Sequence, residues 1–257
     1  MRALINGIGW VTAAGLGRGR QRLGFSRPAG PLPKLSRRML FAEPDQRFGR
    51  LDEYSRLGLA AITMTLRDAG MAEDGQKRPV GVIAATTHGC LTTDLAYLDT
   101  MIPHNGAMAS PNLFAYTLPN CFLGEAAIRF GFTGPGFIIQ EPDPAGYTCL
   151  SLAMAVLGDG DAQTMLAGVC DLSQTIPATV EPQPPAAAVF FALGLVPGPA
   201  GPPYGVLQFD STGSLSFMGQ RVTGIFDLVQ ACLHPAGHGS PVRRATVDLN
   251  LSTPESG

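Results

Sequence analysis

Short apolar runs alternate with longer amphipathic segments along the first two thirds of the chain. Residues 51–69 place apolar side chains at near-helical spacing and are followed by Gly70, which predicts a helix with a glycine stop. Residues 80–85 are uniformly apolar, which predicts a strand covered on both faces, as in a parallel sheet. The remaining patterns predict strands at 3–9, 137–140 and 164–169, and helices at 91–101, 122–130 and 145–157. Because strands and helices alternate, the sequence predicts an α/β layered fold.

The pattern changes after Asp171. Prolines flank the apolar run 186–196, which predicts a strand or one arm of a hairpin. Residues 222–233 suit a helix, and the alternation of apolar and polar residues over 245–251 predicts a half-buried strand. Nearer the N-terminus, residues 17–50 are basic and proline-rich, which predicts a loop with a short helix near residues 37–41.

Composition narrows the possible classes of protein. A chain of 257 residues can bury a substantial core, and a formal net charge of −2 gives no electrostatic footprint for nucleic-acid binding. The five cysteines are odd in number and form no CxxC motif, which favours reduced thiols and indicates no metal-ligand spacing. The longest apolar run is too short to span a membrane, and the first residues do not resemble a signal peptide. We therefore expect a cytoplasmic protein without metal or cofactor.

Four stretches of the first 171 residues follow one another in a characteristic order. They are Ile5-Asn6-Gly7-Ile8-Gly9; Leu51-Asp52 with Tyr54 to Ala61 and Asp68-Ala69-Gly70; Val80-Gly81-Val82-Ile83 running into Thr87-His88-Gly89; and Pro119-Asn120 through Gly134-Pro135 to Gly168. In this order and spacing they resemble the N-terminal half of β-ketoacyl synthases, the condensing enzymes of the thiolase superfamily. The resemblance implies a thiolase-like layered fold. It implies a nearly complete ketosynthase N-terminal domain over residues 1–180, and a reduced C-terminal remnant, residues 181–257, that completes the same domain.

An aspartate occupies the position of the family's nucleophilic cysteine. Counting forward from Gly134-Pro135 and backward from Gly160-Asp161-Ala162 reaches Asp143 both times. A ketosynthase cysteine is acylated because its thiolate is a strong nucleophile, stabilised at a helix N-terminus. An aspartate at the same place is stabilised as an anion but is a weak, hard nucleophile. Asp143 and Pro144 also suit a plain helix cap.

The other catalytic groups of the family are missing as well. The resemblance implies two histidines, in a GTGT-type and a GHxxGAAG-type loop, and a lysine. The four histidines of the chain lie in no such loop; they are His88, His104, His234 and His238. Thr223-Gly224 weakly matches the second loop, with Ile225 where the histidine would be. Cys149 could be a displaced nucleophile, although a cysteine inside an apolar helix is more often a small core residue.

The resemblance also implies residues that line the acyl pocket or face a partner. His88 lies where the family places a residue near the partner's pocket, and the positions that line the pocket are Leu113, Phe114 and Thr117. Alternatively, His88 is a loop histidine whose hydrogen bonds are satisfied within the chain. The alternative for Leu113, Phe114 and Thr117 is plain packing in the core. The predicted strand at 137–140 matches the family strand that pairs with a second subunit; its residues are Phe137, Ile138, Ile139 and Gln140.

Taken together, the resemblance implies a non-catalytic subunit of chain-length-factor type, similar to the short proteins of aryl-polyene pathways. Such a subunit pairs with an active β-ketoacyl synthase in type II polyketide or fatty-acid-like biosynthesis, and an acyl carrier protein is an indirect partner. Two alternatives remain. The chain could be a stand-alone acyl-thioester hydrolase, decarboxylase or acyltransferase that uses Asp143 or Cys149, or it could be an acyl-binding scaffold that forms homodimers.

Overall fold

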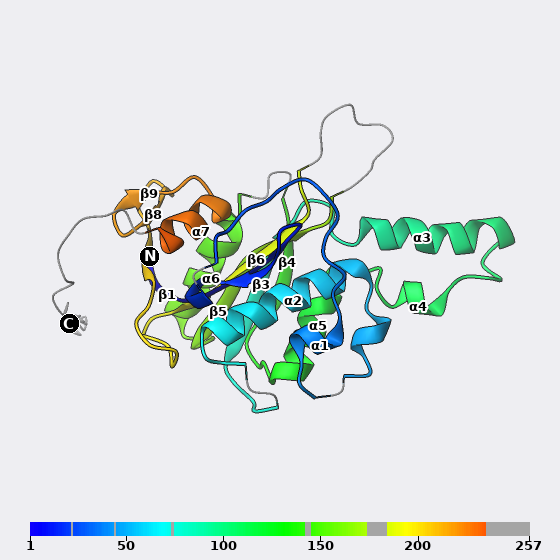
Figure 1. Ribbon diagram of the computed structural model, residues 1–257, viewed down its shortest axis with the longest axis horizontal. Helices are drawn as coiled ribbons and strands as arrows, with labels where there is room; N and C mark the ends of the chain where they lie inside the picture. The colour runs from blue at the N-terminus through cyan, green and yellow to red at the C-terminus, as the bar shows by residue number, and fades with distance from the viewer. Residues whose placement is uncertain (22, 44, 73–74, 142–144, 174–183, 235–257) are drawn as a thin grey trace, which may run out of the picture.

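The computed structural model describes residues 1–21, 23–43, 45–72, 75–141, 145–173 and 184–234. Within these residues a nine-stranded mixed sheet lies between two layers of helices (Figure 1), which confirms the predicted α/β layered fold. The strands are β1 (Arg2–Thr12), β2 (Gly15–Arg18), β3 (Val80–Thr86), β4 (Gly136–Gln140), β5 (Thr164–Asp171), β6 (Ala187–Gly194), β7 (Gly205–Phe209), β8 (Leu215–Phe217) and β9 (Gln220–Arg221). The α-helices are α1 (Arg37–Leu40), α2 (Glu53–Asp68), α3 (Leu91–Met101), α4 (Pro111–Phe114), α5 (Cys121–Phe130), α6 (Tyr147–Asp159) and α7 (Ile225–Leu233). Three short 3-10 helices are η1 (Gly19–Gln21), η2 (Phe48–Arg50) and η3 (Ile102–His104).

The strand order across the sheet is β4-β3-β5-β6-β1-β7-β8-β9, and β2 also pairs with β1. β4 and β5 both run parallel to β3, whereas β6 runs antiparallel to β5 and to β1. Every residue of β3 is buried, as expected for an apolar strand with a neighbour on each side and helices on both faces. The parallel sheet predicted from residues 80–85 is therefore confirmed.

Two hydrophobic cores lie on opposite faces of the sheet, one under α2 and α5 and the other under α6 and α7. Asp52 caps the start of α2, and its side chain accepts a hydrogen bond from the Ser55 backbone N–H at 2.9 Å. Thirteen of its 16 residues are buried. α2 packs directly on β1 because Gly9 has no side chain; a Cβ atom at Gly9 would lie 2.2 Å from the Thr65 backbone nitrogen.

A buried carboxylate closes a gap in the edge of β1. β7 pairs with Arg2–Ile5 and β2 pairs with Gly9–Thr12, so the backbone between these two ladders lacks a strand partner on that side. The Asp68 carboxylate, at the end of α2, accepts hydrogen bonds there from the Ile8 N–H at 2.9 Å and the Tyr204 hydroxyl at 2.7 Å through Oδ2. Its Oδ1 accepts a third from the Arg20 N–H at 2.7 Å.

The structure refines several predicted boundaries. The run 186–196 forms β6, a fully buried strand inside the sheet. The helix expected over 145–157 begins at Tyr147, because Gly146 adopts a φ of +74° just before it. Strands β7, β8 and β9 were not predicted, and the helix expected from residue 222 begins at Ile225. The strand predicted at 245–251 lies outside the described residues.

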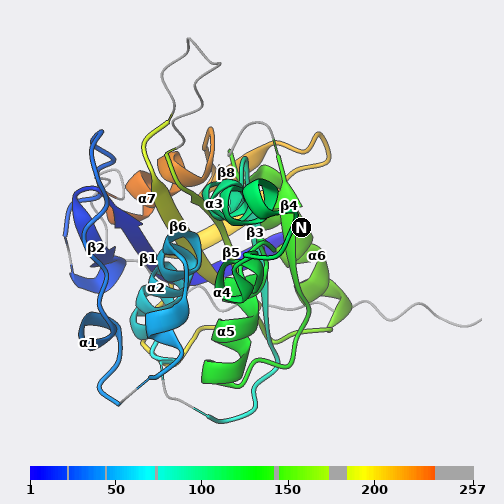
Figure 2. The same cartoon turned by 90° about the vertical axis from the view of Figure 1, so that its right-hand side faces the viewer.

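Helices α3 and α4 project from the body of the molecule (Figures 1 and 2). We call residues 91–118, which include α3, η3 and α4, the arm. Thr93 is the only buried residue of α3, and α4 has none. No described helix is long and apolar enough to cross a lipid bilayer.

Candidate functional site

The carboxyl ends of β3, β4 and β5 meet at one edge of the sheet, the usual place for a site in parallel α/β structures. Thr86 of β3 is in register with Gln140 of β4, and Asp171 ends β5 two residues beyond the Val169–Ala85 pair. Asp143 would follow β4 at this edge, but residues 142–144 lie outside the described ranges. The placement of Asp143 at the tip of a helix therefore stays a prediction.

Asp171 fixes the loop that carries His88. Its Oδ1 accepts hydrogen bonds from the Thr86 hydroxyl and the Thr87 N–H, both at 2.8 Å, and from the His88 N–H at 3.2 Å. Oδ2 is buried and accepts no hydrogen bond from the described residues. Burial raises the pKa of the Asp171 carboxyl. The hydrogen bonds that Asp171 accepts from Thr86, Thr87 and His88 lower this pKa, but they offset the effect of burial only in part. The Gln140 side chain also donates to the Thr87 carbonyl at 3.2 Å, which ties the end of β4 to the same loop.

The start of α7 meets the start of α6 beside this edge. The Ile225 N–H donates to the Ala145 carbonyl at 2.8 Å, and a Cβ atom at Gly146 would lie 3.0 Å from the Ile225 Cβ. Ile225 occupies the position where the resemblance implies a histidine. Its aliphatic side chain packs against the first turn of α6. The Ile225 side chain supplies hydrocarbon packing here and cannot itself take or give a proton.

Sequence reasoning missed the arginine beside these helix ends. A cavity of about 390 Å³ is lined by Arg27, Ala145, Pro184, Thr223, Gly224, Ile225, Phe226 and Asp227. The Arg27 guanidinium carbon lies 3.5 Å from the centroid of the Phe226 ring, and its Nη2 donates to the Pro185 carbonyl at 3.3 Å. Burial lowers the pKa of Arg27, and the negative charge of Asp171 acts against that shift. Arg27 and Phe226 are almost 200 positions apart, and no local pattern predicts their contact.

The predicted pocket residues Leu113, Phe114 and Thr117 lie on the arm. The Phe114 side chain is 62% exposed, and its ring packs on Tyr97 of α3 with a centroid distance of 5.5 Å. Leu113 and Thr117 are half-buried, and the Thr117 hydroxyl donates to the Phe114 carbonyl at 2.9 Å. Phe114 borders a small hollow between α3 and α4.

Strand β4 is an open edge of the sheet. Among the described residues it pairs with β3 alone, and its other side carries no strand. Ile138 and Ile139 are half-buried against the two cores, whereas Phe137 and Gln140 are exposed. The strand that the resemblance assigns to subunit pairing is thus available for another strand.

The structure contradicts the alternative that Cys149 is a nucleophile. Its side chain is 0% exposed, its thiol donates to the Gly146 carbonyl at 3.1 Å, and burial raises its pKa to about 12. A buried neutral thiol neither reaches a substrate nor forms the thiolate that attacks a thioester. In the described ranges no three His, Cys, Asp or Glu side chains gather closely enough to share a metal ion.

Comparison with solved structures shows the same fold in ketosynthases. The ishigamide ketosynthase/chain length factor superimposes with a TM-score of 0.63 at 17% identity, over 80% of this chain and 66% of that one. A β-ketoacyl synthase from Burkholderia phymatum STM815 gives 0.57 at 17% identity, over 80% and 62% of the two chains. A ketosynthase in complex with its chain length factor from Xenorhabdus doucetiae gives 0.54 at 17% identity, over 77% and 81%. The chain thus spans slightly under two thirds of the length of the first two structures.

Sequence comparison identifies the family. No curated protein matches the chain. The family model described as "Beta-ketoacyl synthase, N-terminal domain" matches residues 35–182, which is more than half of the chain. This stretch contains α2, the parallel strands β3, β4 and β5, and the carboxyl edge at which they meet. The chain belongs to the β-ketoacyl synthase N-terminal domain family.

Proposed function

We propose that this chain is a non-catalytic subunit of chain-length-factor type that pairs with an active β-ketoacyl synthase in type II polyketide or fatty-acid-like biosynthesis, of the aryl-polyene kind. The observation that carries the proposal is an apolar surface without a partner in the described chain, formed by the arm and the open edge at β4. Two of the similar structures are described as a ketosynthase with a chain length factor, which supports the same assignment.

The arm exposes several large apolar side chains. Six large apolar side chains on it are between 37% and 66% exposed: Leu95, Leu98, Ile102, Met108, Phe114 and Leu118. An isolated helix of the length of α3 is marginal in water, and here it gains almost no burial against the body. Contiguous apolar patches of this kind mark protein interaction sites. We infer that a partner subunit covers the arm.

The open edge of β4 gives this partner a second point of attachment. Its free backbone groups can extend the sheet into another subunit, and the exposed Phe137 adds apolar contact at the same edge. His88 follows β3, next to β4, and is half-buried in a loop held by Asp171. We propose that Phe137 to Gln140 form the subunit strand, and that His88, Leu113, Phe114 and Thr117 face the partner or its acyl pocket.

The groups that would catalyse condensation are absent from the positions the family uses. Asp143 matches the nucleophile position, and a carboxylate forms only an easily hydrolysed anhydride with an acyl group. Ile225 matches a histidine position and packs against the start of α6. We propose that the chain shapes the acyl tunnel of its partner, and that residues 181–257 complete the same domain as residues 1–180.

Co-expression with a full-length ketosynthase from the same gene neighbourhood tests the pairing. Light scattering after size exclusion should show a heterodimer for the wild-type chain. Changing Ile102 and Phe114, which are 64% and 62% exposed, to Asp should abolish the heterodimer without unfolding the chain. A matched control changes Leu195 and Val196, which are 54% and 65% exposed outside the arm, and should pair normally.

Two results would overturn the proposal. One is condensation of acyl and malonyl thioesters by the purified chain alone. The other is a covalent acyl adduct on this chain after incubation with an acyl carrier thioester, detected by intact mass, which would indicate an acyl-thioester enzyme. A stable homodimer that ignores every ketosynthase offered would favour the scaffold alternative.

A further inference from the structure

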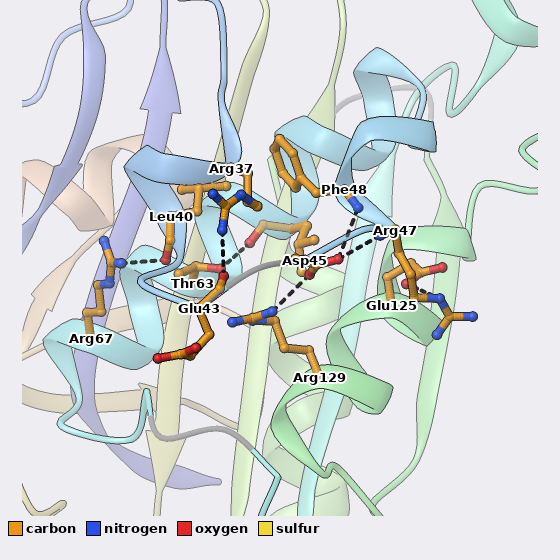
Figure 3. Close-up of polar contacts among 11 residues, drawn as sticks. Arg37, Leu40, Glu43, Asp45, Arg47, Phe48, Thr63, Arg67, Glu125 and Arg129 are labelled. Carbon is orange, nitrogen blue, oxygen red and sulfur yellow. Dashed lines mark hydrogen bonds and ion pairs between the residues drawn. The ribbon is translucent and has the colours of Figure 1, made fainter.

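The arginine beside the start of α7 lacks the carboxylate that completes a similar arginine elsewhere in the chain. The guanidinium carbon of Arg129 lies 3.5 Å from the centroid of the Phe41 ring, and Arg129 pairs with the Asp45 carboxylate at 2.8 Å (Figure 3). Arg27 stacks on Phe226 at the same distance of 3.5 Å. Within the described ranges no carboxylate lies within ion-pair distance of Arg27, so one of these two stacked arginines has a counterion and the other has none.

The guanidinium of Arg27 also has unused hydrogen-bond donors. It carries five N–H groups, and its Nη2 donates to the Pro185 carbonyl at 3.3 Å. Its Nε is buried and has no hydrogen-bond partner among the described residues. Phe226 covers one face of the guanidinium plane, and the donors lie in that plane, where a carboxylate can accept two parallel hydrogen bonds. A bound carboxylate would therefore supply both the missing acceptor and the missing charge.

Aromatic contacts hold the segment that carries Arg27 in place. Phe25 stacks on Phe226 with ring centroids 6.3 Å apart and an angle of 8° between the planes, and it meets Trp10 edge-on at 5.5 Å. The Phe25 carbonyl accepts a hydrogen bond from the Gln230 side chain at 2.9 Å, and Trp10 and Phe25 are both buried. Because the backbone next to Arg27 is already fixed, a ligand that binds there orders little of the chain.

The cavity that Arg27 lines suits a small organic anion. Its volume of about 390 Å³ lies within the range of small-molecule sites, and Ile225 and Phe226 give it an apolar wall. Asp227 also lines the cavity, and its Oδ2 accepts hydrogen bonds from the Thr223 N–H at 2.8 Å and the Thr223 hydroxyl at 3.2 Å. One cation with a carboxylate in the same wall favours a ligand with a single negative charge over a doubly charged one such as phosphate.

This cavity is separate from the surfaces proposed to face a ketosynthase. None of its lining residues belongs to the arm or to β4, and α7 lies on the opposite side of the molecule from α3 (Figure 1). We propose that the cavity is a binding site for a small monocarboxylate, whose carboxyl group pairs with the edge of Arg27 and whose apolar part rests on Ile225 and Phe226. The ligand belongs to this chain itself, so the proposal does not depend on pairing with a ketosynthase.

Isothermal titration calorimetry on the full chain tests the site with three probes: butyrate, its neutral analogue butyramide, and inorganic phosphate. Butyrate should bind to the wild type with a Kd of about 1 mM or lower, and butyramide at least about tenfold more weakly, because it cannot form the charge-assisted pair. Arg27→Met keeps a stem of similar shape without the charge. It should weaken butyrate binding at least about tenfold and leave butyramide binding unchanged, which separates loss of the ion pair from a general disturbance of the cavity.

Two further variants complete the test. Arg221→Met, at an exposed arginine outside the cavity, is the matched control and should bind butyrate like the wild type. Ala145→Leu fills the cavity while Arg27 stays in place, and it should also weaken butyrate binding, so the test still stands if Arg27→Met does not fold.

Several results would contradict the proposed site. Absence of butyrate binding by the wild type, equal binding by Arg27→Met and Arg221→Met, or unchanged binding by Ala145→Leu would each refute it. Phosphate that binds more tightly than butyrate would refute the assignment to a monocarboxylate. Ketosynthase pairing should be the same in all three variants, so a failure of this site and a failure of the proposed function are separate results.

Discussion

Replacement of Asp68 by Ala should destabilise the fold strongly, because this buried carboxylate holds the edge of β1 together. The side chain is fully buried and joins three segments far apart in the chain. It accepts hydrogen bonds from the Ile8 N–H in β1, the Arg20 N–H after β2, and the Tyr204 hydroxyl before β7, at 2.9, 2.7 and 2.7 Å. No strand replaces it at the gap in the edge of β1 among the described residues.

The loss of stability in Asp68→Ala can be worked out from these hydrogen bonds. A hydrogen bond to a charged group contributes about 1.5–3 kcal/mol, and a buried donor left unpaired costs about 1–3 kcal/mol. Removal of the charge also relieves its desolvation, which offsets part of the loss. We expect Asp68→Ala to lower the free energy of unfolding by about 4 kcal/mol. Tyr204→Phe removes one of the bonds and should lower it by about 2 kcal/mol.

Urea denaturation measures both losses, because the single tryptophan, Trp10, is buried in β1 and reports on the core by fluorescence. Because Asp68 and Tyr204 are partners, the double variant should be little less stable than Asp68→Ala alone. Asp99→Ala, at an exposed position of α3, is the control and should change stability by less than about 0.5 kcal/mol. A loss below about 1 kcal/mol for Asp68→Ala, or simple additivity in the double variant, would refute the reasoning.

Three further outcomes follow from the described contacts. Gly9→Ala should destabilise the fold by about 3 kcal/mol or more, because its Cβ would meet the Thr65 backbone nitrogen at 2.2 Å, whereas Gly24→Ala, with open space around it, should change the urea midpoint little. Burial raises the pKa of Asp171, so the folded chain binds this proton more tightly than the unfolded chain, and the contribution of Asp171 to stability falls as the pH rises above the unfolded value of about 3.9. The amide of Asp171→Asn can still accept through its oxygen, so the variant should gain stability relative to the wild type as pH rises, and a constant difference between pH 4 and 7 would contradict this. Iodoacetamide at pH near 8 should modify the half-buried Cys121 before Cys149, whose pKa is raised to about 12, and peptide mass mapping would expose the reverse order.

Local patterns in the sequence were sufficient for the elements that carry the family's motifs. α2 was predictable because its apolar positions repeat at helical spacing and Gly70 follows it. β3 was predictable as a parallel strand because it is apolar on both faces. The order of these motifs also indicated the family, which the match over residues 35–182 confirms.

Other features depend on contacts that no local pattern encodes. The short strands β7, β8 and β9 form because β1 offers an edge to β7, and their own sequences are too short to reveal it. The start of α6 is set by the positive φ of Gly146 and by the packing of Ile225, which lies nearly 80 positions away in the chain. This start could not be placed from residues 145–157 alone.

The amino-acid sequence by itself determined the family and the alternation of strands and helices, because both are read from neighbouring residues or from motif order. Only the tertiary structure decided that Cys149 is sealed in the core, that β4 is an open edge of the described sheet, and that Arg37 and Arg67 donate to backbone carbonyls. The physical reason is that burial, edge exposure and charge compensation depend on which distant segments come together in space. Periodicity reports only on the residues within a few positions of one another.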